Sequence, residues 1–238
     1  MKFVRRKTLI NLICLILVCG AAVEAQTPNA DPQVWPALKV DYDLRPKLRI
    51  ELSQGLEAGD SYRQWITGAK LSYRMRRLLI PSRRDNDEEN QHVLVIAAGY
   101  EYLRTSQNGK IKNENRFGLA GTGHFTPGGG LLLTDRNRIE FRSVDGTYDF
   151  RYRNKIAIDR HFRAGRFSLI PYASGEMFWD RNHHLWNENQ YAFGAQFPYK
   201  THLMVDAYYL HKNCTTCNPK SVNVLGLTVN LFLKTKKK

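Results

Sequence analysis

The chain contains about 11 segments in which apolar and polar residues alternate, and this period of two constrains its fold more than any other feature. In LKVDYDL, for example, Leu38, Val40 and Tyr42 fall on one face of an extended chain, and Lys39 and Asp41 fall on the other. Such alternation is typical of β-strands whose two faces meet different environments. The segments are LKVDYDL, KLRIELS, QWITGAKLSYRMR, HVLVIAAGYEYLR, ENRFGLAGTGHF, two arginine-rich runs within residues 131–162, SLIPYASGEMFWD, QYAFGAQF, HLMVDAYYL and VNVLGLTVNLFL.

The first 25 residues have the pattern of a secretory signal. Residues 1–8 contain four basic residues, residues 9–22 are almost continuously apolar, and Val23 and Ala25 are small residues at the positions that a signal peptidase reads. The apolar run is shorter than the roughly 20 residues of a spanning helix. We therefore expect cleavage after Ala25 and export. The formal net charge of +14 then falls to about +11, and export excludes nucleic acid as a partner of this basic chain.

The exported part of the chain has three possible fates: a periplasmic globule, a secreted protein or an outer-membrane β-barrel. It has no apolar run of about 18 residues, which excludes a helical membrane protein. Alternating segments of about 10 residues, separated by turns, are the pattern of a transmembrane barrel. Because single-chain bacterial barrels usually have an even strand number, we predict an all-β, single antiparallel up-and-down transmembrane β-barrel of 10 to 12 strands in residues 26–233. A basic tail, residues 234–238, follows it.

The expected connections differ in length. Short turns are predicted at Arg45 and Pro46 and at residues 127–130, 164–165 and 198–201. Longer polar links are predicted at residues 80–91, 105–113, 180–189 and 211–220. Short turns at one end and longer loops at the other are typical of bacterial barrels.

The two arginine-rich runs raise the question of what their charged face contacts. In a barrel, Ile139, Phe141 and Ile156 would face lipid while the charged residues point into the lumen. Two interpretations stay open: a mixed-charge ladder that fills the lumen, or a net-positive channel that favours small anions. Candidate acidic partners include Glu101, Glu114, Asp149 and Asp159. The predicted lumen-facing ladder comprises Arg116, Arg136, Arg138, Glu140, Arg142, Arg151, Arg153, Lys155 and Glu176.

Several runs also resemble a known family. They are LTDRNRIEFRS, YDFRYRNKIAI, IPYASGEMFWD and VLGLTVNLFL, and the pairs Asn137-Arg138 and Arg153-Asn154 carry much of the likeness. The chain resembles, from Val34 to Leu233, the bacterial outer-membrane barrel proteins of the domain-of-unknown-function family numbered 2490. The resemblance implies an exported barrel and brings no catalytic or ligand-binding residues with it. Unlike barrels that close on an aromatic residue, this chain has Leu233 on the apolar face of its last strand.

Cys214 and Cys217 are the only cysteines outside the signal, in the sequence NCTTCNPK. An even pair in an oxidising compartment most often forms a disulfide. A metal site needs more nitrogen or sulfur ligands, and only His211 lies close in sequence. We therefore predict a small loop disulfide and neither a metal nor a cofactor.

The enzymatic alternative is a barrel that hydrolyses outer-membrane lipid. His184, in the polar stretch DRNHHLWNEN, could activate Ser168 or Ser174 as a nucleophile. Neither serine lies in a nucleophile motif. The leading hypothesis is thus a non-enzymatic outer-membrane barrel, structural or a narrow pore. Its expected partners are outer-membrane lipid, lipopolysaccharide and the barrel-assembly machinery.

Overall fold

The computed structural model describes residues 30–60, 62–76, 92–165, 167–182 and 184–234. In these residues the chain is all-β, and no helix is long and apolar enough to cross a membrane. The predicted signal at residues 1–25 and the predicted loop at residues 80–91 lie outside the described residues. All but the first residue of the predicted tail, residues 234–238, lies outside them too.

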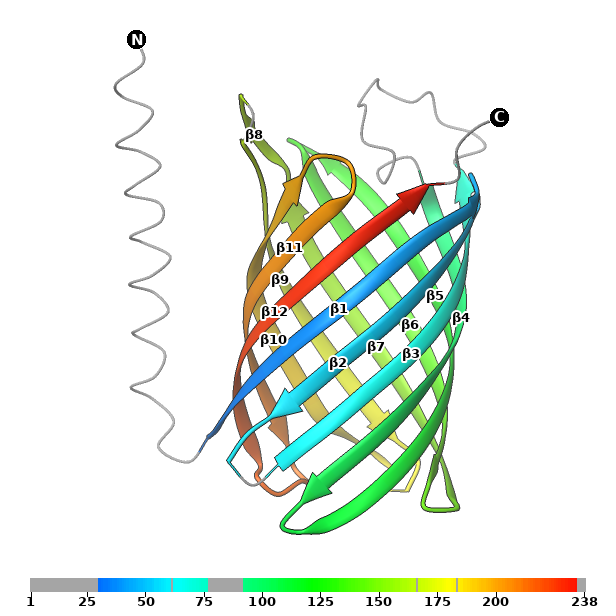
Figure 1. Ribbon diagram of the computed structural model, residues 1–238, viewed down its shortest axis with the longest axis vertical. Coiled ribbons are helices and arrows are strands. Elements are labelled where there is room, and N and C mark those ends of the chain that lie inside the picture. The colour runs from blue at the N-terminus through cyan, green and yellow to red at the C-terminus, as the bar shows by residue number, and fades with distance from the viewer. Residues whose placement is uncertain (1–29, 61, 77–91, 166, 183, 235–238) are drawn as a thin grey trace. The chain divides into compact units, whose positions relative to one another are not determined.

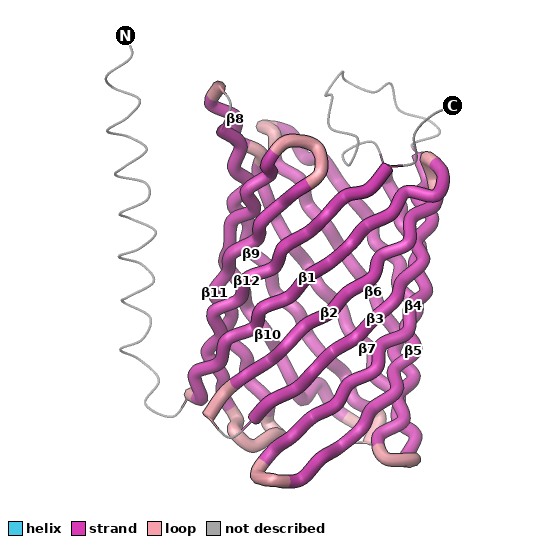
Figure 2. The backbone as a smooth tube through the Cα atoms, in the orientation of Figure 1, coloured by secondary structure: helices cyan, strands magenta, loops and turns pink. Residues whose placement is uncertain are grey.

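Eleven long strands form one closed barrel, and a twelfth, three-residue strand extends its wall (Figures 1 and 2). Each long strand hydrogen-bonds to two neighbours, and β12 pairs with β1 to close the ring. This confirms the predicted single barrel of 10 to 12 strands. The strands are β1 (Asp31–Arg45), β2 (Leu48–Ala58), β3 (Tyr62–Arg76), β4 (His92–Gln107), β5 (Lys110–Gly128), β6 (Leu131–Val144), β7 (Thr147–Arg160), β8 (Phe162–Ala164), β9 (Phe167–Asp180), β10 (Leu185–Tyr199), β11 (Leu203–Cys214) and β12 (Ser221–Lys234).

The closing pair differs from the fully antiparallel barrel that the sequence predicts. β1 and β12 run parallel, with Asp31 opposite Val222 and Asp43 opposite Lys234. The reason is the odd number of strands: when consecutive strands alternate in direction, the first and the eleventh point the same way. The chain therefore begins its first strand at one end of the barrel, the Asp31 end, and finishes its last at the other, the Lys234 end (Figure 1).

The prediction of long polar links at residues 105–113 and 180–189 is wrong, because strands include most of the residues of both segments. β4 and β5 are joined by Asn108 and Gly109 alone, and both residues have positive φ, 50° and 76°. Asn-Gly is the preferred sequence for a two-residue hairpin turn with two positive φ angles. Asp145 and Gly146 make the same kind of turn between β6 and β7. These dipeptides are turn signals, and the prediction of a long link at residues 105–113 overlooked the first of them.

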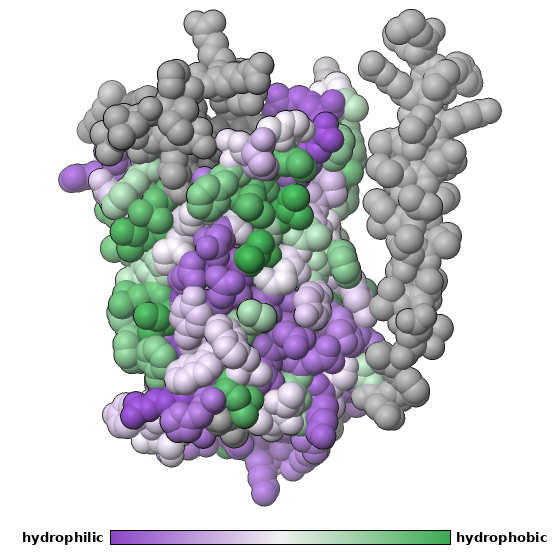
Figure 3. Space-filling model, turned by 180° about the vertical axis from the view of Figure 1, so that it is seen from behind, coloured by the Kyte–Doolittle hydropathy of each residue, from purple (hydrophilic) through white to green (hydrophobic). Residues whose placement is uncertain are grey.

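The outer face of the barrel carries the apolar residues of the alternating segments. Leu225 is 64% exposed and Phe193 is 58% exposed, whereas Val224, which points inward from the same strand as Leu225, is 0% exposed. Figure 3 shows apolar residues toward both ends of one wall. An apolar exterior around a polar interior is the reverse of a soluble domain and matches a barrel that contacts lipid.

Tyrosines cover glycines on the inner face of the wall formed by β9 to β12. Tyr208 lies opposite Gly226, and Tyr172 lies opposite Gly194. A Cβ atom added at Gly226 would come within 1.9 Å of the Tyr208 ring. The glycines thus leave room for large rings that fill the lumen, a known device of curved sheets.

Gly226→Ala should therefore destabilise the barrel by about 1–3 kcal/mol, because the Tyr208 ring must leave its position. Urea unfolding of the refolded protein, followed by tryptophan fluorescence, measures the loss. Gly55→Ala is the matched control, since a Cβ there meets no atom closer than 3.9 Å. Equal midpoints for both variants would contradict the packing role of Gly226.

Candidate functional site

The charged residues of β6 and β7 lie on the inner face of the barrel. Arg138 of β6 lies 2.9 Å from Glu101 of β4, and Arg136 of β6 lies 3.0 Å from Glu176 of β9. These partners are two strands apart in the sheet order. Neighbouring strands are about 4.8 Å apart, so side chains two strands away meet only on the concave side. The register therefore brings the arginine-rich face into the lumen.

Glu140 is the centre of this network. Its side chain is 0% exposed, and its Oε1 atom lies 2.8 Å from Arg153 and 3.0 Å from Arg138. Its Oε2 atom lies 3.8 Å from Arg116. One carboxylate is thus surrounded by three guanidinium groups contributed by three consecutive strands. A charge so fully removed from solvent is tolerated only when it is paired.

A second group of ion pairs lies toward the Asp31 end. Arg142 binds Glu114 with two hydrogen bonds, of 2.6 and 2.9 Å, the fork geometry that makes arginine–carboxylate pairs strong. The same guanidinium lies 3.5 Å from Asp149 and 3.7 Å from Asp180. Arg151 also lies 3.7 Å from Asp180. Asp180, at the end of β9, is a partner that sequence reasoning missed.

All six arginines of the predicted ladder lie within 3.7 Å of a carboxylate oxygen. Arg153 also lies 4.5 Å from the ring centre of Phe178, which is 2% exposed and fills the space beside the network. Lys155 lies opposite Glu176 in the register, but no carboxylate of the described residues lies within ion-pairing distance of it. The ladder and its acidic partners together therefore carry little net charge.

A further ionic cluster, which sequence reasoning did not identify, joins β1, β2 and β3. Asp43 accepts hydrogen bonds from Arg49 at 2.8 Å and from Arg74 at 2.7 Å. Nearby, Lys70 donates to Glu51 at 2.7 Å. The available signal was the charged face of LKVDYDL and KLRIELS, which alternate as the arginine-rich runs do but with fewer charges.

The wall formed by β10, β11 and β12 carries an apolar cluster on its inner face. Ala192, Leu210, Val222 and Val224, from β10, β11 and β12, form a buried cluster, and Tyr208 packs against it. Charged side chains thus fill the lumen along one wall and apolar side chains along another.

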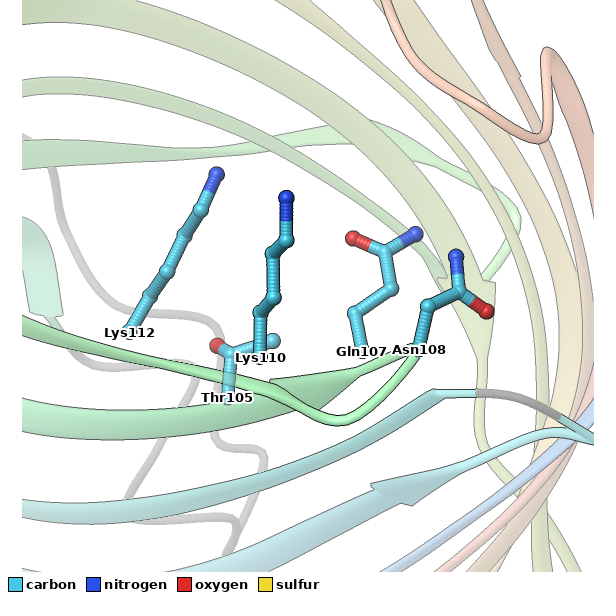
Figure 4. A pocket seen from close by; sticks show the side chains of 5 residues that line it. All are labelled: Thr105, Gln107, Asn108, Lys110 and Lys112. Carbon is cyan, nitrogen blue, oxygen red and sulfur yellow. The ribbon is translucent and has the colours of Figure 1, made fainter.

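Lysines line the opening of the lumen at the Asp31 end. Lys110 and Lys112 of β5 stand beside Thr105, Gln107 and Asn108 of the β4–β5 hairpin around a cavity of about 180 Å³ (Figure 4). Among the described residues, no carboxylate lies within ion-pairing distance of either lysine. Gln107 also donates a hydrogen bond of 2.9 Å to the backbone of Asn218, in the link between β11 and β12. This link therefore reaches across part of the opening.

The structure contains a disulfide between Cys214 and Cys217, with the Cα atoms 5.3 Å apart. Glu188 lies close enough for its carboxylate and the two sulfur atoms to form a three-ligand group. A disulfide offers no thiolate, and metals bind cysteine as the thiolate. This group therefore does not fit a metal ion.

The predicted pairing of His184 with Ser168 or Ser174 is wrong. His184 lies in the turn between β9 and β10, at the Asp31 end, whereas Ser168 is the second residue of β9, at the Lys234 end. Ser174 lies between them, paired with Ala157 and Ala192. A different histidine, His161, contacts the Ser168 hydroxyl through its Nε2 atom. Both residues belong to the β8–β9 hairpin region, beyond the last pairing of β7 with β9.

Replacing Glu140 should cost the barrel about 3–5 kcal/mol, because Glu140→Ala leaves three guanidinium groups without their shared partner. Urea unfolding measures this loss. Lys110→Ala, which removes an unpaired charge at the opening, is the control and should change stability by under about 0.5 kcal/mol. A Glu140→Ala midpoint equal to that of wild type would contradict the central role of Glu140.

Comparison with known proteins gives a family and two distant structures. No curated protein matches the chain. The translocator domain of the autotransporter NalP from Neisseria meningitidis aligns with 76% of this chain and 72% of its own, at 12% identity and a TM-score of 0.44. The anion-selective porin from Comamonas acidovorans aligns with 79% of this chain, at 9% identity and a TM-score of 0.36, and this chain spans about half (53%) of that porin. A family model matches residues 32–223, and the chain therefore belongs to the family described as protein of unknown function (DUF2490).

Proposed function

We propose that this chain is a non-enzymatic outer-membrane β-barrel protein whose lumen is closed by its own ion pairs. The observation that carries the proposal is the Glu140 network: a carboxylate with 0% exposure, held by Arg138 and Arg153. A water-filled channel would expose its lining to solvent. The fold supports the membrane location, because the apolar residues face outward.

The balance of charge supports a closed lumen over an anion channel. Anion-conducting pores present rings of arginine or lysine to the passing ion. Here each ladder arginine has a carboxylate within 3.7 Å, so its charge is largely offset. Lipid and lipopolysaccharide would surround such a barrel, and the barrel-assembly machinery would insert it.

Refolded wild-type protein in a planar bilayer should give no steady conductance. Loosening the network should open a narrow path, and the remaining charges should set its ion preference. Glu140→Ala leaves three arginines without their shared carboxylate and should favour anions. Arg153→Ala removes one cation while Arg138 and Arg136 still pair with Glu140 and Glu176, so it should be less anion-selective than Glu140→Ala. Reversal potentials under a salt gradient measure the preference.

Each variant must show heat-modifiable migration, which establishes that it folded into a barrel. Steady anion-selective steps from folded wild-type protein would replace the closed-lumen proposal with the anion-pore interpretation. Gln64→Ala is the control for a polar substitution inside the lumen outside the network, and it should stay silent.

A second candidate is hydrolysis of membrane lipid, which the contact between His161 and Ser168 favours. A histidine within reach of a serine hydroxyl can accept its proton and activate the oxygen as a nucleophile. The pair lies at the Lys234 end of the barrel.

An activated Ser168 should be labelled by a fluorophosphonate probe, and Ser168→Ala should abolish the label. His161→Ala should lower the labelling rate by roughly 10²-fold or more, as expected for loss of a general base. Ser174→Ala is the matched control and should label like wild type. Absence of labelling in folded wild-type protein would eliminate the enzyme.

A further inference from the structure

A polar cluster that contains a carboxylate lies on the outer face of the barrel, on β6 and β7. Among the described residues of the eleven long strands, the register turns a single carboxylate outward, that of Asp135 on β6. Asn137 on the same strand and Asn154 on β7 point the same way and lie opposite each other. Figure 3 shows hydrophilic residues at mid-height of this wall, between apolar residues above and below.

These side chains bind one another. The Asn154 amide donates to Asp135 at 2.9 Å and to Asn137 at 3.0 Å, and the Asn137 amide lies 3.3 Å from Asp135. The Tyr152 hydroxyl donates to Asn137. The cluster can still make further hydrogen bonds. The Asp135 carboxylate and the Asn154 amide oxygen can accept more of them, and the Asn137 amide has a second hydrogen to donate.

Acyl chains cannot satisfy that capacity. Asn154 is the eighth of the 14 residues of β7, so the cluster lies well inside the wall and not at a headgroup boundary. Charged groups on the lipid face of a barrel are destabilising in a manner that grows toward the middle of the bilayer. A partner that offers hydrogen bonds would remove this cost.

Gly121, which lies opposite Asn137, leaves open space beside the cluster, and this space is called the hollow. A Cβ atom at Gly121 would meet nothing within 4 Å, whereas one at Gly123 would come within 3.2 Å of the Phe125 ring. Ile139, 37% exposed, follows Asn137 on the outward face of β6, and Ile156, 52% exposed, lies opposite Asp135. A polar centre with an apolar rim is a feature of protein–protein interfaces, although there the centre is usually the more apolar part.

We infer that this outer patch, formed by Gly121, Gly123, Asp135, Asn137 and Asn154, binds a second copy of the chain across a two-fold axis; the inference rests on the proposed membrane location. An isologous interface needs donors and acceptors on the same surface. The patch has both, so the Asn137 amide of each copy can bond to Asp135 of the other. The hollow at Gly121 gives each copy a place for a rim side chain, and small residues let neighbouring walls approach closely.

Native mass spectrometry of the refolded protein in lipid nanodiscs tests the inference. Wild type should be dimeric. Gly121→Leu fills the hollow without a clash in the monomer and should weaken the dimer at least about tenfold. Combined replacement of Asp135, Asn137 and Asn154 by leucine, which makes the patch an ordinary lipid face, should give monomers that resist urea as well as wild type does.

Ala69→Leu is the matched control, because it adds the same side chain to an outward position on β3, and it should remain dimeric. Monomeric wild type in nanodiscs, or an unchanged Gly121→Leu dimer, overturns the inference. A lipid that copurifies with wild-type monomers and is lost from the triple variant overturns it in favour of lipid binding. Extraction of the chain from liposomes by carbonate would instead overturn the membrane location itself.

Discussion

Backbone hydrogen bonding between β1 and β12 is the interaction on which the rest of this structure depends. The two strands pair along their length, from Asp31 opposite Val222 to Asp43 opposite Lys234. Without that pairing the sheet would have two open edges, and unpaired backbone groups are too costly in hydrocarbon for an open sheet to span a bilayer. Closure also fixes which face of each strand is inside. The odd strand number is accommodated by making this one pair parallel.

Closure then explains the charges. Once the sheet is a ring, the polar face of every strand is directed into a narrow lumen, and the charged residues of β5 to β9 have to neutralise one another. Glu140 does so for three arginines, and Glu114 and Asp180 do so toward the Asp31 end. On the wall of β10 to β12, apolar residues and tyrosines packed over glycines occupy much of the lumen instead. Side chains from both walls occupy the lumen, and the proposed closed lumen follows from the two together.

The polar residues of the outer patch also need hydrogen-bonding partners, but the barrel itself does not supply all of them. Inside the barrel, a carboxylate finds arginines on neighbouring strands. On the outside, the side chains that bond to Asp135 among the described residues are the amides of Asn137 and Asn154. The open space at Gly121 lets a second chain approach closely enough to supply hydrogen bonds to the cluster.

The sequence by itself predicted a barrel of 10 to 12 strands, most strand boundaries to within a few residues, and the face of the side chains in the segments that alternate clearly, because a period of two is a local property. It did not predict the two-residue turn at Asn108 and Gly109, since the surrounding polar residues suggested a longer loop. Tertiary structure alone decided that β1 and β12 pair in parallel and that Arg142 meets Asp180 two strands away. It also decided that His161, and not His184, lies beside Ser168. Alternation shows which face a residue occupies, but the register between strands decides which residues meet, and register is set by the whole ring at once.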